Sequence, residues 1–114
     1  MKAPRTAGRN ELLPGTLEML ILKTLSIGPM HGYGIAQHIQ QLSADVLTVE
    51  EGSLYPALQR MLVKGSVSAE WRISVNNRRA RFYTVTAAGR KQLGVEELRF
   101  SQVFGAIMRV MKTT

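Results

Sequence analysis

The end of the chain carries an apolar repeat that a small domain cannot cover alone. Its members are separated alternately by four and three residues, the period of a coiled-coil seam. They are Leu93, Glu97, Phe100, Phe104, Ile107 and Met111, of which only Glu97 is polar. We therefore expect a helix over 87–112, capped by Thr86. A helix of about 25 residues is about 37 Å long, so its far half is expected to pack on a second copy of the chain. Packing within one subunit is the alternative.

A second apolar segment, residues 16–27, also indicates pairing between subunits. Leucine, isoleucine and methionine fill most of its helical positions after the break at Pro14-Gly15. A helix that is apolar over most of its surface in a small domain is expected to be covered partly by another subunit. The residues that we assign to this dimer interface are Leu17, Leu20, Leu93, Phe100, Phe104, Ile107 and Met111.

A short helix is expected to follow the His-Gly-Tyr-Gly sequence at 31–34 and to end near Leu42. Glycine there permits a tight helix entry. We interpret His31 and Tyr33 as packing and helix-entry residues, because no carboxylate, serine or second histidine is placed to complete a catalytic set. A functional pair is the alternative. Residues 43–49 then form a short connector to a third helix.

The third helix, residues 50–64, has one apolar stripe and several polar positions. The stripe consists of Leu54, Leu58, Met61 and Leu62, which recur at helical spacing and should face the core. The polar positions are Ser53, Tyr55, Gln59, Arg60 and Lys64. Hydroxyl, amide and cationic groups can meet base edges and phosphate oxygens, so this segment is a candidate recognition helix. An ordinary amphipathic surface helix is the alternative.

The next segment predicts a hairpin. Residues 67–74 alternate strictly between apolar and polar, as in a half-buried strand. Asn76-Asn77 tolerates the positive φ of a turn, and residues 79–86 return as the second strand. A two-stranded hairpin is marginal alone, so its apolar face should lie on the helices, with Trp71 in the core.

Positive charge is concentrated around this hairpin. The chain has 15 Lys and Arg against 8 Asp and Glu, a net charge of +7. Between Arg60 and Lys91 there are eight cations and a single acid, Glu70, so this region alone carries the excess. Arg78, Arg79 and Arg81 lie at the expected hairpin tip and are expected to bind phosphates. A solvated charged turn is the alternative.

Several functional classes are disfavoured by composition. There is no cysteine, which excludes disulfides, thiolate nucleophiles and cysteine-bound zinc. Two histidines, no glycine-rich phosphate loop and no carboxylate pair argue against an enzyme, so we expect no catalytic residue, no metal site and no cofactor. No apolar run reaches the roughly 18 residues of a membrane span. We expect a cytoplasmic protein whose residues 1–12 form a flexible basic arm.

Four stretches carry a resemblance to a known family. They are Pro-Gly-Thr-Leu at 14–17, His-Gly-Tyr-Gly at 31–34, Gly-Ser-Leu-Tyr-Pro-Ala-Leu-Gln-Arg at 52–60, and Arg-Arg-Ala-Arg-Phe-Tyr-Thr-Val-Thr-Ala-Ala-Gly-Arg at 78–90. The chain resembles the PadR family of bacterial winged helix-turn-helix transcriptional regulators. The resemblance implies an α+β, mostly helical fold. Residues 13–86 would be a DNA-binding domain of three helices and a two-stranded wing, and 87–112 a C-terminal dimerisation helix. It also implies a homodimeric repressor relieved by a small hydrophobic or phenolic effector.

These observations combine into one hypothesis. A dimer would place two recognition helices about 34 to 36 Å apart on palindromic double-stranded DNA. Ser53, Tyr55 and Gln59 would lie nearest the bases or phosphates, and the residues expected to neutralise the backbone are Arg60, Lys64, Arg78, Arg79 and Arg81. A winged-helix protein-interaction module that binds an acidic partner is the alternative function.

Overall fold

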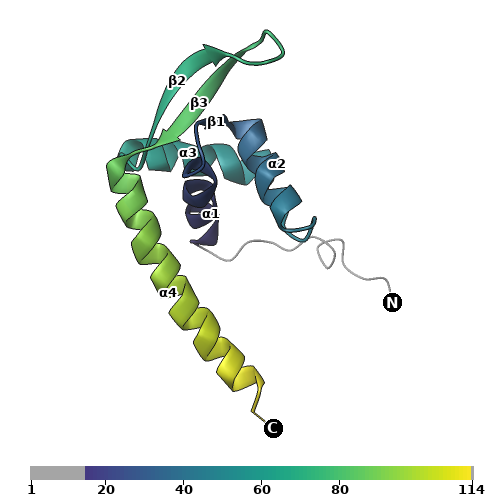
Figure 1. Cartoon of the computed structure of the whole chain (residues 1–114), viewed down its shortest axis with the longest axis vertical. Helices are drawn as coiled ribbons and strands as arrows, with labels where there is room; N and C mark the ends of the chain where they lie inside the picture. The colour runs from purple at the N-terminus through teal and green to yellow at the C-terminus, as the bar shows by residue number, and fades with distance from the viewer. Residues whose placement is uncertain (1–14, 114) are drawn as a thin grey trace.

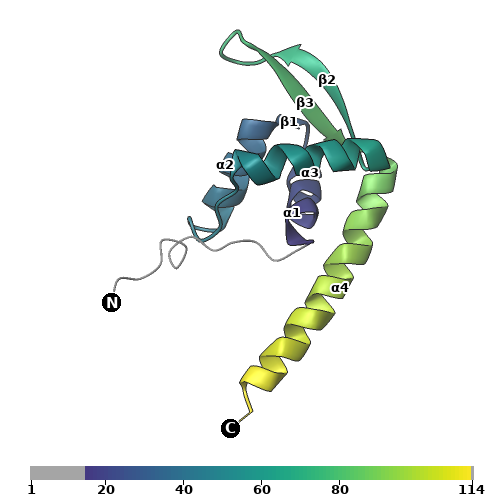
Figure 2. The same cartoon turned by 180° about the vertical axis from the view of Figure 1, so that it is seen from behind.

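The computed structural model describes residues 15–113. Its elements are α1 (Thr16–Leu25), β1 (Met30–His31), α2 (Gly32–Leu42), α3 (Glu51–Lys64), β2 (Val67–Ile73), β3 (Arg79–Val85) and α4 (Ala87–Met111). The first three helices form a body, from which the β2–β3 hairpin projects at one end and α4 at the other (Figure 1). From behind, α3 crosses the body between the hairpin and α4 (Figure 2). The expected mostly helical winged-helix fold is confirmed.

The core lies where α1, α2 and α3 meet. Its largest fully buried side chains are Ile21, Leu22, Leu25, Ile35, Leu54, Leu58 and Met61. Burying a side chain of this size contributes roughly 1.5 to 3 kcal/mol. Three of the four residues expected to form the stripe of the third helix are in this set, and Leu62 is partly buried against it. The helical period therefore identified the inner face of α3 correctly.

Helix ends are fixed by side-chain and glycine caps. The N–H of Gly34 donates to Nδ1 of His31 at 3.0 Å, so His31 has the expected helix-entry role. Thr86 caps α4 by accepting a hydrogen bond at Oγ1 from the N–H of Gly89 at 3.0 Å. The same hydroxyl donates to the carbonyl of Gly65 at 2.7 Å. Gly65 ends α3 with φ at +81°, a conformation that glycine adopts at little cost. One threonine thus joins the end of α3 to the start of α4.

The sheet has three strands in the order β1-β3-β2, all antiparallel. The hairpin was expected, but β1 was not. Met30 pairs with Tyr83 and His31 with Phe82, which ties the entrance of α2 to the hairpin. A strand of two residues is too short to show alternation, so its sequence contains no periodic signal.

The expectation that Trp71 lies in the core is wrong. Its side chain is 57% exposed, and Ile73 on the same strand is 65% exposed. Only the base of the hairpin is covered, where Val67 pairs with Val85 and both are buried. The strands extend past the body (Figure 1), so their outer halves have nothing to pack on. The alternating pattern correctly predicted which residues share a face of the strand. It did not predict how much of that face the helices cover.

The packing of Gly89 generates a stability prediction. A Cβ at this position would overlap the backbone carbonyl oxygen of Ser66 and lie 2.8 Å from Cγ2 of Val85. We expect Gly89→Ala to lower the free energy of unfolding by about 1 to 3 kcal/mol, the usual cost of overpacking, in chemical denaturation. Gly94→Ala is the matched control, because nothing lies within 4 Å of its Cβ position. It should stabilise the helix by up to about 1 kcal/mol. Equal stability of the two variants would contradict the close packing of α4 on the body.

Candidate nucleic-acid interface

Tyr55 and Gln59 lie on the side of α3 that faces the start of α2. A Cβ at Gly32 would be 2.7 Å from the Tyr55 hydroxyl, so the phenol packs directly on this helix entry. Gln59 is one turn further along α3 and exposed. Burial, followed by the charge of Glu51 and the influence of Tyr83, raises the pKa of Tyr55. The phenol therefore stays protonated at neutral pH and can donate a hydrogen bond to a base or phosphate.

Arg60 and Lys64, expected to bind DNA phosphates, have a partner within the body. Nε of Arg60 lies 3.2 Å from Oε2 of Glu18, and Nζ of Lys64 lies 2.7 Å from Oε1 of the same residue. Burial acts to raise the pKa of Glu18, but the hydrogen bonds and positive charges of Lys64 and Arg60 outweigh it and lower the pKa. The two cations thus hold α1 against α3, and about half of each side chain remains exposed.

The polar residues of α3 therefore do not form one face. At about 100° per residue, Ser53 projects from the same edge as Arg60 and Lys64, on the side of α1. Tyr55 projects from the opposite edge. The exposed arc of α3 spans about half of the helix circumference. Polar residues on this arc can therefore lie on opposite edges of the helix. Only Tyr55 and Gln59 lie toward the sheet and the α2 entrance.

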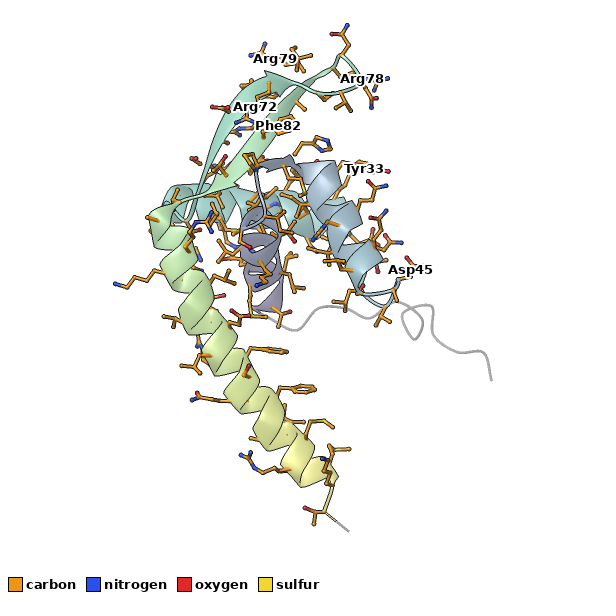
Figure 3. All side chains as sticks on the ribbon, in the orientation of Figure 1. Tyr33, Asp45, Arg72, Arg78, Arg79 and Phe82 are labelled. Carbon is orange, nitrogen blue, oxygen red and sulfur yellow. The ribbon has the colours of Figure 1, made fainter. Side chains whose placement is uncertain are left out.

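The wing tip carries arginines that lack carboxylate partners. Within residues 15–113, no ion pair involves Arg78, Arg79 or Arg81, whereas Arg72 pairs with Glu70. Figure 3 shows Arg78 and Arg79 at the outer end of the hairpin, away from the body. Because no acid offsets them, these charges remain available for phosphate oxygens.

Sequence reasoning did not assign Tyr33 to the site. Its side chain is 66% exposed in the first turn of α2, and its ring lies 6.5 Å from the ring of His31. Figure 3 shows it at the end of α2 that is closer to the wing. A helix N-terminus has free N–H groups and a partial positive charge that favour phosphate. The sequence signal was the position of this tyrosine inside a glycine-rich helix entry, which we interpreted as packing.

Acidic side chains near the start of α3 make part of this surface unfavourable for DNA. A groove of about 700 Å³ runs between α2 and the start of α3, and its lining includes Asp45, Glu50 and Glu51 as well as Tyr33 and Tyr55. Asp45 lies at the end of α2 far from the wing (Figure 3). Carboxylates repel phosphates, so this groove is unsuited to the backbone of a duplex. The favourable surface runs instead from Tyr55 toward the wing.

The residues expected at a dimer interface divide into three groups by exposure. Phe100, Phe104, Ile107 and Met111 are exposed along α4, and the rings of Phe100 and Phe104 stack with centroids 5.9 Å apart. Leu17 and Leu20 are partly buried against the core. Leu93, by contrast, is buried within its own subunit, because the first turns of α4 lie against the body. Leu93 is therefore not available to a partner.

A groove of about 580 Å³ separates the start of α1 from α4. Its apolar lining comes from Met19, Phe100, Val103, Phe104 and Ile107. Glu18 and Lys64 also line it, so the groove borders the ion pair that connects α1 and α3. A single subunit leaves this apolar surface open.

Residues 15–113 show neither a metal-binding cluster nor a membrane-spanning helix. No group of three histidine or acidic side chains is placed to hold a metal ion there. None of the helices in this range is long and apolar enough to cross a membrane. The arm expected at residues 1–12 lies outside the described residues.

Known proteins resemble this chain in sequence and in fold. A 37.1 kDa protein in transposon TN4556 of Streptomyces fradiae is 37% identical over 90 residues, covering 79% of this chain and 24% of that protein. The chain thus spans about a quarter of the length of this relative.

Two solved structures match the fold over most of both chains. A transcriptional regulator from Clostridium thermocellum aligns with a TM-score of 0.79 at 22% identity, covering 86% of this chain and 95% of the other. A PadR-like transcriptional regulator from Bacillus cereus aligns with a TM-score of 0.75 at 24% identity, covering 88% and 95%. At these identities the likeness shows the fold.

The family assignment rests on a match across most of the chain. The model of the transcriptional regulator PadR-like family matches residues 21–95, from α1 through the wing to the first turns of α4. Its members are transcriptional regulators and not enzymes. The chain belongs to the PadR-like family of transcriptional regulators.

Proposed function

We propose that this chain is a sequence-specific DNA-binding repressor that acts as a homodimer in the cytoplasm. The observation that carries the proposal is that the uncompensated arginines of the wing project from a hairpin that β1 ties to the α2 entrance, on which Tyr55 packs. A duplex that meets one of these surfaces would also meet the other. Hydrogen-bonding groups on a helix next to cations on a wing suit base edges and backbone phosphates respectively.

The roles within the site follow from the chemistry of each group. Tyr55 and Gln59 would read base edges from α3, while Arg78, Arg79 and Arg81 bind phosphates. Ser53, Arg60 and Lys64 stay outside the proposed contact, since they project toward α1. In a dimer the two α3 helices would lie about 34 to 36 Å apart, one turn of DNA, on a palindromic operator.

The exposed seam of α4 supports pairing of two copies. Four large apolar side chains lie along one side of a helix that extends beyond the body, with the apolar groove beside α1 next to them. A second copy with the same seam would cover both surfaces. A small hydrophobic or phenolic effector would enter this groove and release the DNA by changing how the two subunits are oriented.

Selection of DNA from the source genome tests the proposed function. We expect the chain to retain particular genomic fragments in preference to random DNA of equal length in gel-shift assays. If each wing binds three phosphates, a dimer neutralises about six, and log K should fall with log salt at a slope of about −5. Equal retention of random and genomic DNA would favour the protein-interaction alternative, and salt-insensitive binding would exclude the phosphate contacts.

Two sets of variants separate the proposed roles. Arg79→Ala with Arg81→Ala should weaken all duplexes about equally and reduce the salt slope to about −2, because four phosphate contacts per dimer are lost. Gln59→Ala should instead change sequence preference by about 1 to 3 kcal/mol at one position of the operator. Arg60→Ala is the control from the other edge of α3 and should change neither property. A loss of affinity in the control equal to that of the wing variant would contradict this division.

The pairing surface is tested on α4. We expect Phe104→Glu to weaken the dimer by about thirtyfold or more, since it places a charge in the centre of an apolar contact. Analytical ultracentrifugation measures the change. Val95→Glu is the matched control, because Val95 is 59% exposed on the side of α4 away from the seam. A wild-type chain that is monomeric at micromolar concentration, or a Phe104→Glu chain that remains dimeric, would refute the interface.

A further inference from the structure

The two faces of the wing differ in their chemistry. In the β2–β3 register, Trp71 pairs with Arg81 and Ile73 pairs with Arg79. Paired residues point to the same side of a sheet, so these four side chains share one face, which we call the arginine face. The opposite face carries Glu70 and Arg72, the latter pairing with Ala80. The wing therefore presents two distinct surfaces to anything that approaches it.

Only the arginine face has an uncompensated charge. The guanidinium of Arg79 lies over the Trp71 ring at 4.9 Å, and that of Arg81 lies over the Tyr83 ring at 5.9 Å. On the other face Arg72 lies over the ring of Phe82 at 5.3 Å but also pairs with Glu70. Its charge is therefore largely neutralised before any ligand arrives.

The arginine face ends in the core at its base. At its base Ala69 pairs with Tyr83, and both pack with the core. Tyr83 also pairs with Met30 of β1, just before the α2 entrance on which Tyr55 packs. The hairpin thus links the guanidinium groups of Arg81 and Arg79 to the part of the body that carries Tyr55.

The exposed Trp71 indole on the arginine face has a contact that accounts for its position. Trp71 is 57% exposed, and the Arg79 guanidinium lies over its ring. A guanidinium held over a ring by a cation–π contact has five N–H donors and can still donate to a phosphate. Stacking also restricts the rotamers of a long side chain before a ligand binds, which lowers the entropy lost on binding.

We infer that Trp71 is a positioning residue that holds Arg79 on the phosphate backbone, and that the arginine face of the wing meets the duplex while the Glu70 face does not. This inference rests on the proposed DNA-binding function. It assigns a role to a residue that its alternating pattern had indicated as core.

A double-mutant cycle tests the coupling of Trp71 and Arg79. The probe is a labelled mixed-sequence duplex of about 30 base pairs, three turns, titrated at two salt concentrations with the full chain. We expect Trp71→Leu to weaken binding about fivefold, the size of an exposed cation–π contact, and Trp71→Phe to recover most of the loss. Arg79→Ala should cost less in the Trp71→Leu background than in the wild type. Additive losses, or wild-type affinity in Trp71→Leu, would overturn the inference.

A matched control on the other face preserves net charge. The double variant Glu70→Gln, Arg72→Gln removes both partners of the ion pair. We expect its DNA affinity to stay within about twofold of wild type. A loss as large as that of Trp71→Leu would show that both faces meet the duplex and would overturn the inference. Thermal melting of each variant shows whether the fold is intact, and Trp71→Leu should melt close to wild type because the indole is mostly exposed.

The tryptophan also reports directly on its own surroundings. Trp71 is the only tryptophan in the chain, so intrinsic emission comes from the wing alone. Saturating duplex should change this emission in the wild type and in the Glu70→Gln, Arg72→Gln control. Unchanged emission with DNA bound would overturn the inference while leaving the proposed function in place. A wild-type chain that binds no duplex would overturn the proposed function itself.

Discussion

The hydroxyl of Thr86 makes the connection on which the arrangement of this molecule depends. It donates to the carbonyl of Gly65 at the end of α3 and accepts from the N–H of Gly89 at the start of α4. The backbone N–H of Thr86 also donates to the carbonyl of Ser66 at 3.1 Å. Because Gly89 has no Cβ, α4 can approach this carbonyl closely. The direction of α4 relative to α3 is therefore fixed by a few hydrogen bonds, and with it the relation between the proposed pairing surface and the proposed DNA surface.

Aromatic rings decide which of the arginines remain available on the wing. Three arginine guanidinium groups lie over aromatic rings, but only that of Arg72 also has a carboxylate neighbour. Stacking leaves the charge in place, whereas an ion pair offsets it, so the two faces differ although both contain arginine. The acids of the α2–α3 groove, which Tyr55 also lines, disfavour phosphate beside them. Net charge alone indicated a polyanionic partner. The positions of the charged side chains indicate the side from which such a partner would approach.

The sequence revealed what depends on local period and missed what depends on distant contacts. The stripe of Leu54, Leu58 and Met61 and the cap at Thr86 follow from spacing and residue type, and both are confirmed. The partner of Arg60 and Lys64 lies 42 and 46 positions away, and nothing in a local window points to Glu18. Trp71 shows the same limit. Its alternation is real, but its burial depends on where the helices end.

The ion pair between Glu18 and Lys64 gives the groove beside α4 a physical connection to α3. Both residues line the groove, and both hold α1 on the helix proposed to read DNA. Occupation of the groove would change the solvent around this pair, and the strength of an ion pair depends strongly on its exposure to water. A groove occupant would also lie against Phe100 and Phe104, whose helix is joined to α3 through Thr86. The body therefore contains two short connections from the groove to α3, and neither requires the core to repack.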